Sequence, residues 1–253
     1  MNVELLRTSA GFNDVAVLAY EARRPRGVTL VVGHGYSSSK HNLDALCAFV
    51  ASHGFAVYSL DFPGHKLGAS GGTLRSVEDL VDAFAAVVAL ARSRGAGPVY
   101  AAGHSMGAVT ALCAAGADPR IAGAISIATG WGRPQALQAL AGRGVVDLRS
   151  SYVEGLSLPE IAGAWGPLLE GALPRLAGRP TLVIAAERDG MVARASVDDL
   201  FERMPEPKTF ATVASDHTLA GENSRSAILT WLGALHPRSV LASGAPAPAD
   251  LAL

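Results

Sequence analysis

Cysteine, net charge and long hydrophobic runs are all scarce in this chain, and each shortage excludes a class of protein. The formal net charge is -1 at pH 7, so nothing predicts a nucleic-acid partner or electrostatic docking to a membrane. Hydrophobic residues make up 49% of the sequence, but many of them are alanine. No uninterrupted apolar run reaches the roughly 18 residues of a spanning helix, so we expect no integral membrane segment.

The two cysteines and the N-terminus indicate the compartment. Cys47 and Cys113 each lie among apolar residues of an expected helix, which is typical of buried thiols in a reducing compartment rather than of a disulfide. Residues 1–7 lack a basic segment followed by an apolar one, so the sequence predicts no signal peptide. We therefore expect a cytoplasmic protein.

Apolar strand patterns alternate with amphipathic helix patterns along most of the 253 residues, which are enough for one large α/β domain. Two short strands around a turn at residues 9–13 predict an antiparallel hairpin at a sheet edge. The later alternation predicts parallel strands joined by right-handed crossovers. The strands after the hairpin are expected at residues 28–32, 55–60, 99–103, 124–128, 181–185 and 208–213.

The alternation breaks between residues 130 and 178. We interpret 130–178 as a helical cap inserted over the carboxyl-terminal edge of the sheet. The core is then formed by residues 1–129 and 179–235. A tail over 236–253, rich in proline, alanine and serine, has little to pack against, so we expect it to be flexible.

The clearest chemical signal is Gly103-His104-Ser105-Met106-Gly107, at the end of an apolar strand and the start of a helix pattern. A nucleophilic serine at such a sharp turn needs very small residues two positions before and after it, because any side chain there would collide with the neighbouring backbone. The helix that begins at the serine also directs unpaired backbone N–H groups toward any oxyanion formed there.

A serine hydroxyl is a poor nucleophile unless a base removes its proton during attack. Of the seven histidines, His217 lies in a loop after a late strand, where it can reach the edge that carries Ser105. A third group must hold the imidazole in one tautomer, and Asp189 lies just past the strand that ends near residue 185. We expect Asp189 rather than Glu187 or Asp216 to orient His217.

On four motifs, taken in order, the chain resembles the α/β-hydrolase family from about residue 28 to residue 235. The motifs are His34-Gly35, the serine pentapeptide at 103–107, the segment 186–192 around Asp189, and Asp216-His217. The resemblance implies a mostly parallel central sheet with helices on both faces and an inserted helical cap. It also implies an oxyanion hole formed by the backbone N–H groups of Tyr36 and Met106. The loop 61–68 is longer than the family's usual glycine turn.

These features together predict a serine hydrolase that cleaves an ester of a small, largely apolar acyl compound through an acyl-enzyme. Gly35, Trp131 and Trp165 are expected to contact the substrate, and the chemistry needs no metal or organic cofactor. Thioester cleavage is the nearest alternative, because the pentapeptide also resembles that of discrete acyl-carrier thioesterases. Acyl transfer to an alcohol, C–C bond hydrolysis and a non-catalytic ligand-binding protein of the same fold stay open, as does the oligomeric state.

Overall fold

The computed structural model describes residues 1–132 and 145–238. The strands of this part of the chain are β1 (Asn2–Ala10), β2 (Asn13–Glu21), β3 (Thr29–Gly33), β4 (Ala56–Leu60), β5 (Val99–His104), β6 (Ile121–Ile127), β7 (Thr181–Ala186) and β8 (Lys208–Val213). Its helices are η1 (Lys40–Leu43), α1 (Asp44–Ser52), α2 (Val77–Arg94), α3 (Met106–Ala117), α5 (Val145–Ser151), α6 (Leu158–Ala172), η2 (Leu173–Leu176), α7 (Arg194–Arg203), α8 (Ala220–Asn223) and α9 (Arg225–Leu235).

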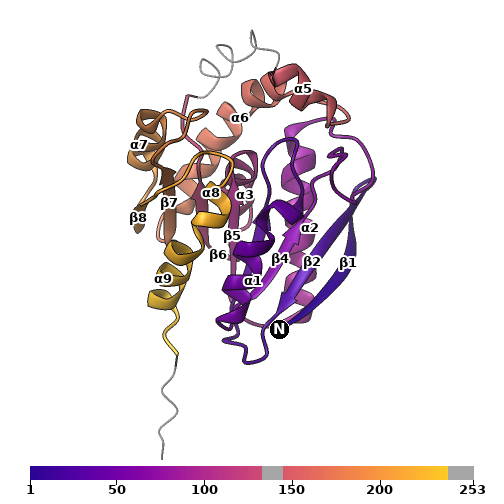
Figure 1. Cartoon of the computed structure of the whole chain (residues 1–253). Helices are drawn as coiled ribbons and strands as arrows, with labels where there is room; N and C mark the ends of the chain where they lie inside the picture. The colour runs from indigo at the N-terminus through magenta and orange to yellow at the C-terminus, as the bar shows by residue number, and fades with distance from the viewer. Residues whose placement is uncertain (133–144, 239–253) are drawn as a thin grey trace, which may run out of the picture.

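The strands form one sheet in the order β1-β2-β4-β3-β5-β6-β7-β8 (Figure 1). β1 and β2 make the expected antiparallel hairpin at one edge, and β2 also pairs antiparallel with β4. From β4 to β8 every neighbouring pair is parallel. The carboxyl ends of these strands therefore meet at one edge of the sheet, where loops from β3, β5, β7 and β8 can converge. The fold is that of the α/β hydrolases.

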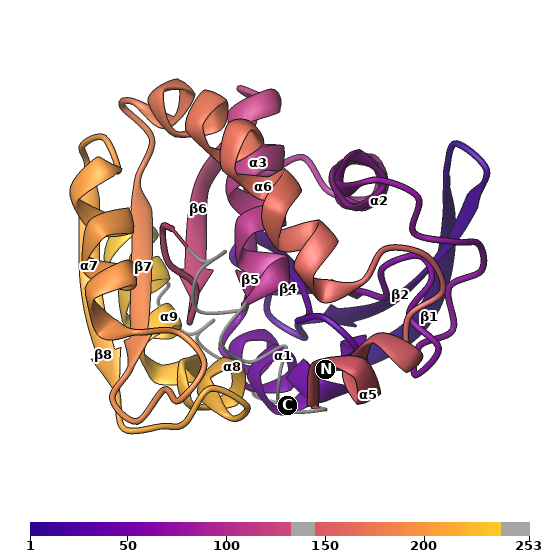
Figure 2. The same cartoon turned by 90° about the horizontal axis from the view of Figure 1, so that it is seen from above.

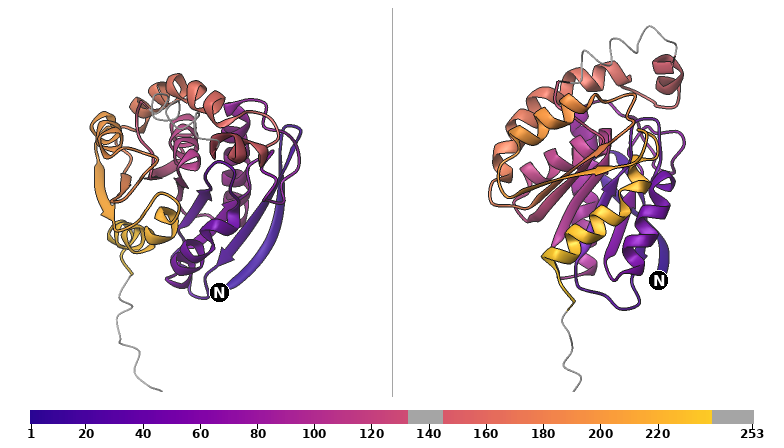
Figure 3. Two further views of the ribbon diagram at one scale, coloured as in Figure 1. Left: turned by 45° about the horizontal axis from the view of Figure 1, so that its top comes forward. Right: turned by 60° about the vertical axis from the view of Figure 1, so that its left-hand side comes forward.

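Two helical layers cover the sheet. Side chains of α2, α3, α6 and α7 share one apolar core with one face, whereas α1, α8 and α9 pack in a second core on the other face. Figure 2, which looks down on the strands, shows α3 and α6 on one side of the sheet and α1 and α8 on the other, and Figure 3 shows this layering from two further directions. Cys47 and Cys113 are both buried free thiols, as the sequence predicts.

Helix α6 begins at a capping box in which the Ser157 backbone N–H donates to the carboxylate of Glu160. Its buried side chains, among them Trp165 and Leu169, belong to the same core cluster as α3. The carboxyl-terminal turn of α6 lies directly against α3, because a Cβ added to Gly116 would come within 2.7 Å of the Ala172 Cβ. The part of the expected cap that forms α6 therefore packs against α3.

The boundaries of an inserted cap stay a prediction, because residues 133–144 of that segment lie outside the described residues. The greater part of the expected tail, 239–253, also lies outside them. Within the described residues, the longest helices are too short or too polar to cross a bilayer.

Candidate active site

Ser105 occupies the sharp turn between β5 and α3. Its backbone has φ +55°, a left-handed conformation that is unusual for a residue with a side chain, and its N–H donates to the Ile127 carbonyl at 2.8 Å. A Cβ at Gly103 would lie 2.1 Å from the Gly107 carbonyl oxygen, and a Cβ at Gly107 would lie 2.2 Å from a carbonyl oxygen of β3. Both glycines are therefore required by close backbone approach, for the reason inferred from the sequence.

His217 lies in the loop after β8 and contacts Ser105, which lies 112 positions earlier in the chain. Its Nε2 is 3.0 Å from the Ser105 Oγ, and its Nδ1 is 2.8 Å from the Asp189 Oδ2. A carboxylate only accepts hydrogen bonds, so the Nδ1–H donates to Asp189 and leaves Nε2 free to accept from the serine hydroxyl. The structure thus brings together the three residues expected from the sequence.

Asp189 is held in its turn after β7 by two backbone donors. Its Oδ1 accepts from the N–H groups of Met191 and Val192, each at 2.8 Å. Burial alone raises the pKa of the Asp189 carboxyl, but the hydrogen bond and charge of His217 and these two backbone donors outweigh it, so the pKa lies below its usual range. Asp189 therefore carries its negative charge at neutral pH and can stabilise an imidazolium at His217.

The two other carboxylates considered for orienting His217, Asp216 and Glu187, have different surroundings. Asp216 accepts a hydrogen bond from the Leu219 backbone N–H at 2.9 Å and so caps its own loop. Glu187 is exposed at the end of β7. Neither carboxylate is a described hydrogen-bond partner of His217, whose ring contacts Asp189 and Ser105.

The loop after β3 lies beside the serine. A Cβ at Gly35 would be 3.5 Å from the Ser105 Cβ, so the backbone of this loop approaches the nucleophile closely. Met106 is the first residue of α3, and the N–H groups of a helix's first turn have no partner within the helix. The Tyr36 hydroxyl is turned toward α6 and donates to the Leu156 carbonyl at 3.0 Å.

A buried histidine fixes the shape of the same loop. The His34 Nδ1–H donates to the Gly35 carbonyl at 2.7 Å, and its Nε2 accepts from the Phe62 backbone N–H at 3.0 Å. Burial lowers the pKa of His34 to about 4, so the ring is neutral at pH 7, as this donor and acceptor pair requires. A buried ion pair between Lys40 and Asp61 ties the far end of the loop to the segment after β4.

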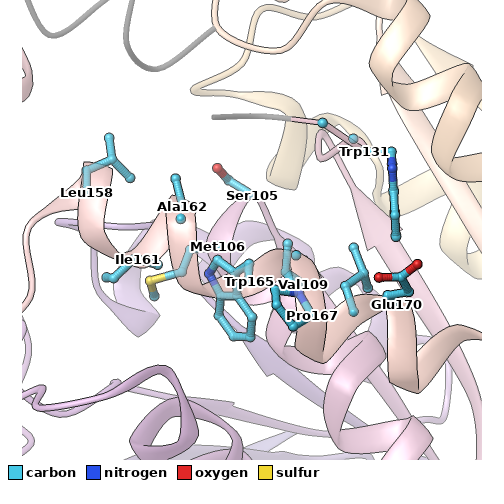
Figure 4. A pocket seen from close by; sticks show the side chains of 15 residues that line it. Ser105, Met106, Val109, Trp131, Leu158, Ile161, Ala162, Trp165, Pro167 and Glu170 are labelled. Atoms are coloured by element: carbon cyan, nitrogen blue, oxygen red, sulfur yellow. The ribbon is translucent and has the colours of Figure 1, made fainter. Parts of the chain in front are cut away.

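An apolar groove of about 300 Å³ opens beside Ser105, and we call it the α3–α6 groove (Figure 4). Leu158 lies at one end, Trp131 and Glu170 lie at the other, and Ser105 lies between them. The Arg203 guanidinium stacks 4.6 Å from the centre of the Trp131 ring. The described lining residues are Ser105, Met106, Val109, Gly130, Trp131, Gly132, Leu158, Ile161, Ala162, Gly163, Trp165, Gly166, Pro167, Leu169 and Glu170.

Both tryptophans expected at the substrate site, Trp131 and Trp165, line the groove, whereas Gly35 lies at the serine and not in the groove wall. The sequence analysis did not predict the small residues of α6 that line it. A signal was available, because a helix pattern interrupted by Gly163, Gly166 and Pro167 is unusual.

His104, the residue before Ser105, also takes part in the site. Its Nε2 lies 2.7 Å from the backbone carbonyl oxygen of His217, and the two rings are 4.9 Å apart. A carbonyl oxygen only accepts, so the proton of His104 is on Nε2. His104 thus joins the turn that carries Ser105 to the loop that carries His217.

Residues 1–132 and 145–238 contain no cluster of three or more histidine, cysteine, aspartate or glutamate side chains arranged to hold a metal ion. The groups gathered at Ser105 are instead a hydroxyl, an imidazole and a carboxylate in one chain of hydrogen bonds, beside the first turn of α3.

Solved structures with this architecture span nearly the whole chain. An α/β hydrolase, GrgF, from Penicillium sp. sh18 superposes with a TM-score of 0.68 at 18% identity, over 92% of this chain and 97% of that one. The esterase Pf2001 of Pyrococcus furiosus has a TM-score of 0.71 at 17% identity over 92% of each chain. A thioesterase domain of the curacin biosynthetic pathway has a TM-score of 0.60 at 16% identity, over 92% of this chain and 99% of that one.

At these identities the similarity demonstrates the fold and leaves the substrate open. No curated protein sequence matches the chain significantly. The family described as serine aminopeptidase, S33, matches residues 23–165, which is more than half of the chain and includes the serine turn. The chain belongs to this family of α/β hydrolases, and it is an enzyme of the hydrolase type.

Proposed function

We propose that this protein is a serine hydrolase that cleaves a carboxylic ester of a small, largely apolar acyl compound. The observation that carries the proposal is the chain of hydrogen bonds from Ser105 through His217 to Asp189, at 3.0 and 2.8 Å. Such a chain needs an acceptor at Nε2 and a fixed donor at Nδ1, which is the arrangement that activates a serine.

In the proposed reaction, the Ser105 Oγ attacks the ester carbonyl carbon while the His217 Nε2 takes the hydroxyl proton. The oxygen of the tetrahedral intermediate accepts hydrogen bonds from the backbone N–H groups of Met106 and Tyr36. The imidazolium then gives its proton to the departing alkoxide, which leaves an acyl group on Ser105. A water molecule deprotonated by the same imidazole attacks this acyl-enzyme and releases the carboxylic acid.

The apolar wall of the α3–α6 groove supports the choice of an apolar acyl compound, because burying such a group there removes it from water. The same wall suits the acyl part of a thioester equally well. Thioester hydrolysis is therefore the second candidate, and its chemistry differs only in the leaving atom. The family name describes an aminopeptidase, so an amide substrate belongs in the same assay.

A fluorophosphonate probe tests the proposed nucleophile. We expect one adduct on the native protein, mapped to Ser105 by mass spectrometry, because only an activated serine reacts at a useful rate. Ser105→Ala should abolish both labelling and ester hydrolysis, whereas Ser93→Ala, a matched change in α2, should keep both. An adduct elsewhere, or none on the folded wild type, contradicts the proposal. A larger kcat/KM for an aminoacyl anilide than for any ester contradicts the choice of esters.

A further inference from the structure

Helix α6 contains glycines that packing within the protein does not require. Gly163 and Gly166 lie in its interior, where glycine is less stable than alanine. A Cβ added to either residue would meet nothing within 4 Å. Both glycines are exposed and line the α3–α6 groove, so a side chain at either position would stand in open space at the groove wall.

The groove and His217 approach Ser105 from opposite faces of the sheet. The groove wall comes from α3 and α6, whose side chains belong to the core on one face. The loop of His217 leads into α8, which packs with α1 and α9 in the core on the other face (Figure 2). A Cβ at Gly221 of α8 would lie 2.4 Å from a methyl group of Leu43, which confirms the side on which this loop sits.

This arrangement decides which part of an ester enters the groove. The carbonyl carbon bound to Ser105 carries an oxyanion, a leaving oxygen and an acyl group. The leaving oxygen must lie at the His217 Nε2 to receive its proton, and the oxyanion must lie at the backbone N–H groups. The acyl group then points away from His217, toward the groove wall, which does not include His217.

The composition of the wall decides which acyl groups fit. Of the described residues that line the groove, only Glu170 is charged, and it lies at the far end from Leu158 (Figure 4). An acyl group that ends in a carboxylate or phosphate would be repelled by Glu170, and the Arg203 side chain, which stacks on Trp131 at that end, is not among the described residues that line the groove. An uncharged, apolar acyl chain that packs along Met106, Val109 and Trp165 is stabilised by leaving water.

On the basis of the proposed function, we infer that the α3–α6 groove is the acyl-binding site for uncharged, apolar acyl chains, and that Gly163 and Gly166 keep it wide enough to hold them. Selectivity then resides in the acyl part of the substrate. Esters and thioesters of one acyl chain share the same groove contacts, so both series should show the same dependence on chain length.

The test measures kcat/KM for p-nitrophenyl acetate, butanoate, hexanoate and octanoate, and for the matching thioesters of a small thiol. In the wild type we expect kcat/KM to rise about fourfold for each methylene until the groove is filled. Gly163→Leu and Gly166→Leu should lower the octanoate-to-acetate ratio by about tenfold or more, the equivalent of roughly two buried methylenes. Gly163→Ala and Gly166→Ala, which favour the helix, should lower it less.

Gly171→Leu is the matched control, because Gly171 lies in the same helix, a Cβ there meets nothing within 4 Å, and it is not part of the groove wall. Its ratio should equal that of the wild type. An unchanged ratio in folded Gly163→Leu and Gly166→Leu overturns the acyl-groove inference, as does a stronger dependence on leaving-group length than on acyl length. If Ser105 is neither labelled nor needed for hydrolysis, the proposed function itself fails.

Discussion

His104 offers a sharp test of how the site is held together. Its Nε2–H donates to the backbone carbonyl of His217 at 2.7 Å, and its Nδ1 lies 3.2 Å from the position of a Cβ on Gly35. One side chain therefore spans the serine turn, the histidine loop and the glycine loop after β3. Replacing it by leucine removes the donor at roughly constant size, whereas glutamine can present an N–H near the position of Nε2.

The expected losses of stability and of kcat in His104→Leu follow from this one hydrogen bond. One such bond contributes about 1 kcal/mol to folding stability, so His104→Leu should remain folded. A displacement of about 1 Å between reacting groups can cost about 100-fold in rate. Since the bond holds the backbone of His217 itself, we expect kcat to fall between about fivefold and 100-fold. KM should change little, because His104 is not part of the groove wall.

Steady-state hydrolysis of p-nitrophenyl butanoate and the rate of fluorophosphonate labelling both measure this effect. His104→Gln should recover most of the kcat lost in His104→Leu, and a purely space-filling role would not produce that recovery. His53→Leu, at the end of α1, controls for the loss of a histidine far from the site. The reasoning is refuted if His104→Leu retains wild-type kcat, or if the glutamine variant is as slow as the leucine variant.

Two further outcomes follow from charges in the structure. Asp189→Asn should lower kcat by about 10⁴, because the amide favours the wrong tautomer of His217, whereas Asp216→Asn should cost less than about tenfold; equal losses in the two variants would contradict the assignment. Burial lowers the pKa of His34 to about 4 and, together with the charge of His34, that of His65 to about 3. Both rings stay neutral in the folded protein while the unfolded chain takes up protons below about pH 6.5, so stability should fall as the pH drops from there toward 4. Each ring contributes up to about 1.4 kcal/mol per pH unit to that slope, and urea unfolding of His65→Gln should show a shallower dependence between pH 6 and 5; a slope equal to the wild type would count against it.

Much of the architecture was predictable because it depends on local patterns. The strand over 208–213 has the bounds that the sequence predicts. The start of α2 is likewise determined by neighbouring residues, because Ser76 and Asp79 form a capping box. Patterns of this kind depend on backbone geometry within a few residues, so they are present in the sequence before any distant contact forms.

The serine turn was predictable for the same reason. Gly103 must be small because the turn brings the Gly107 backbone against it, which is a contact between near neighbours in the sequence. Gly107 must be small because it lies against the Gly33 carbonyl of β3, a distant contact that the pentapeptide pattern indicates without showing its cause. Choosing Asp189 over Asp216 also followed from local geometry, since adjacent side chains of an extended segment point to opposite sides.

Three features depend on contacts between residues far apart in the sequence: the α3–α6 groove, the hydrogen bond of His104 and the placement of α6. The periodicity of α6 indicates that one of its faces is buried. The sequence does not say which element covers that face, and only the tertiary structure places it in one core with α3. His104 and His217 are separated by 113 positions, and no pattern within either segment encodes the hydrogen bond between them. By itself, the sequence determined the strands, the helices and the identity of the reactive groups, because these follow from short-range sterics and hydrogen bonding. The tertiary structure decided which surfaces meet, and therefore which space beside Ser105 stays open, because that depends on the packing of whole layers against one another.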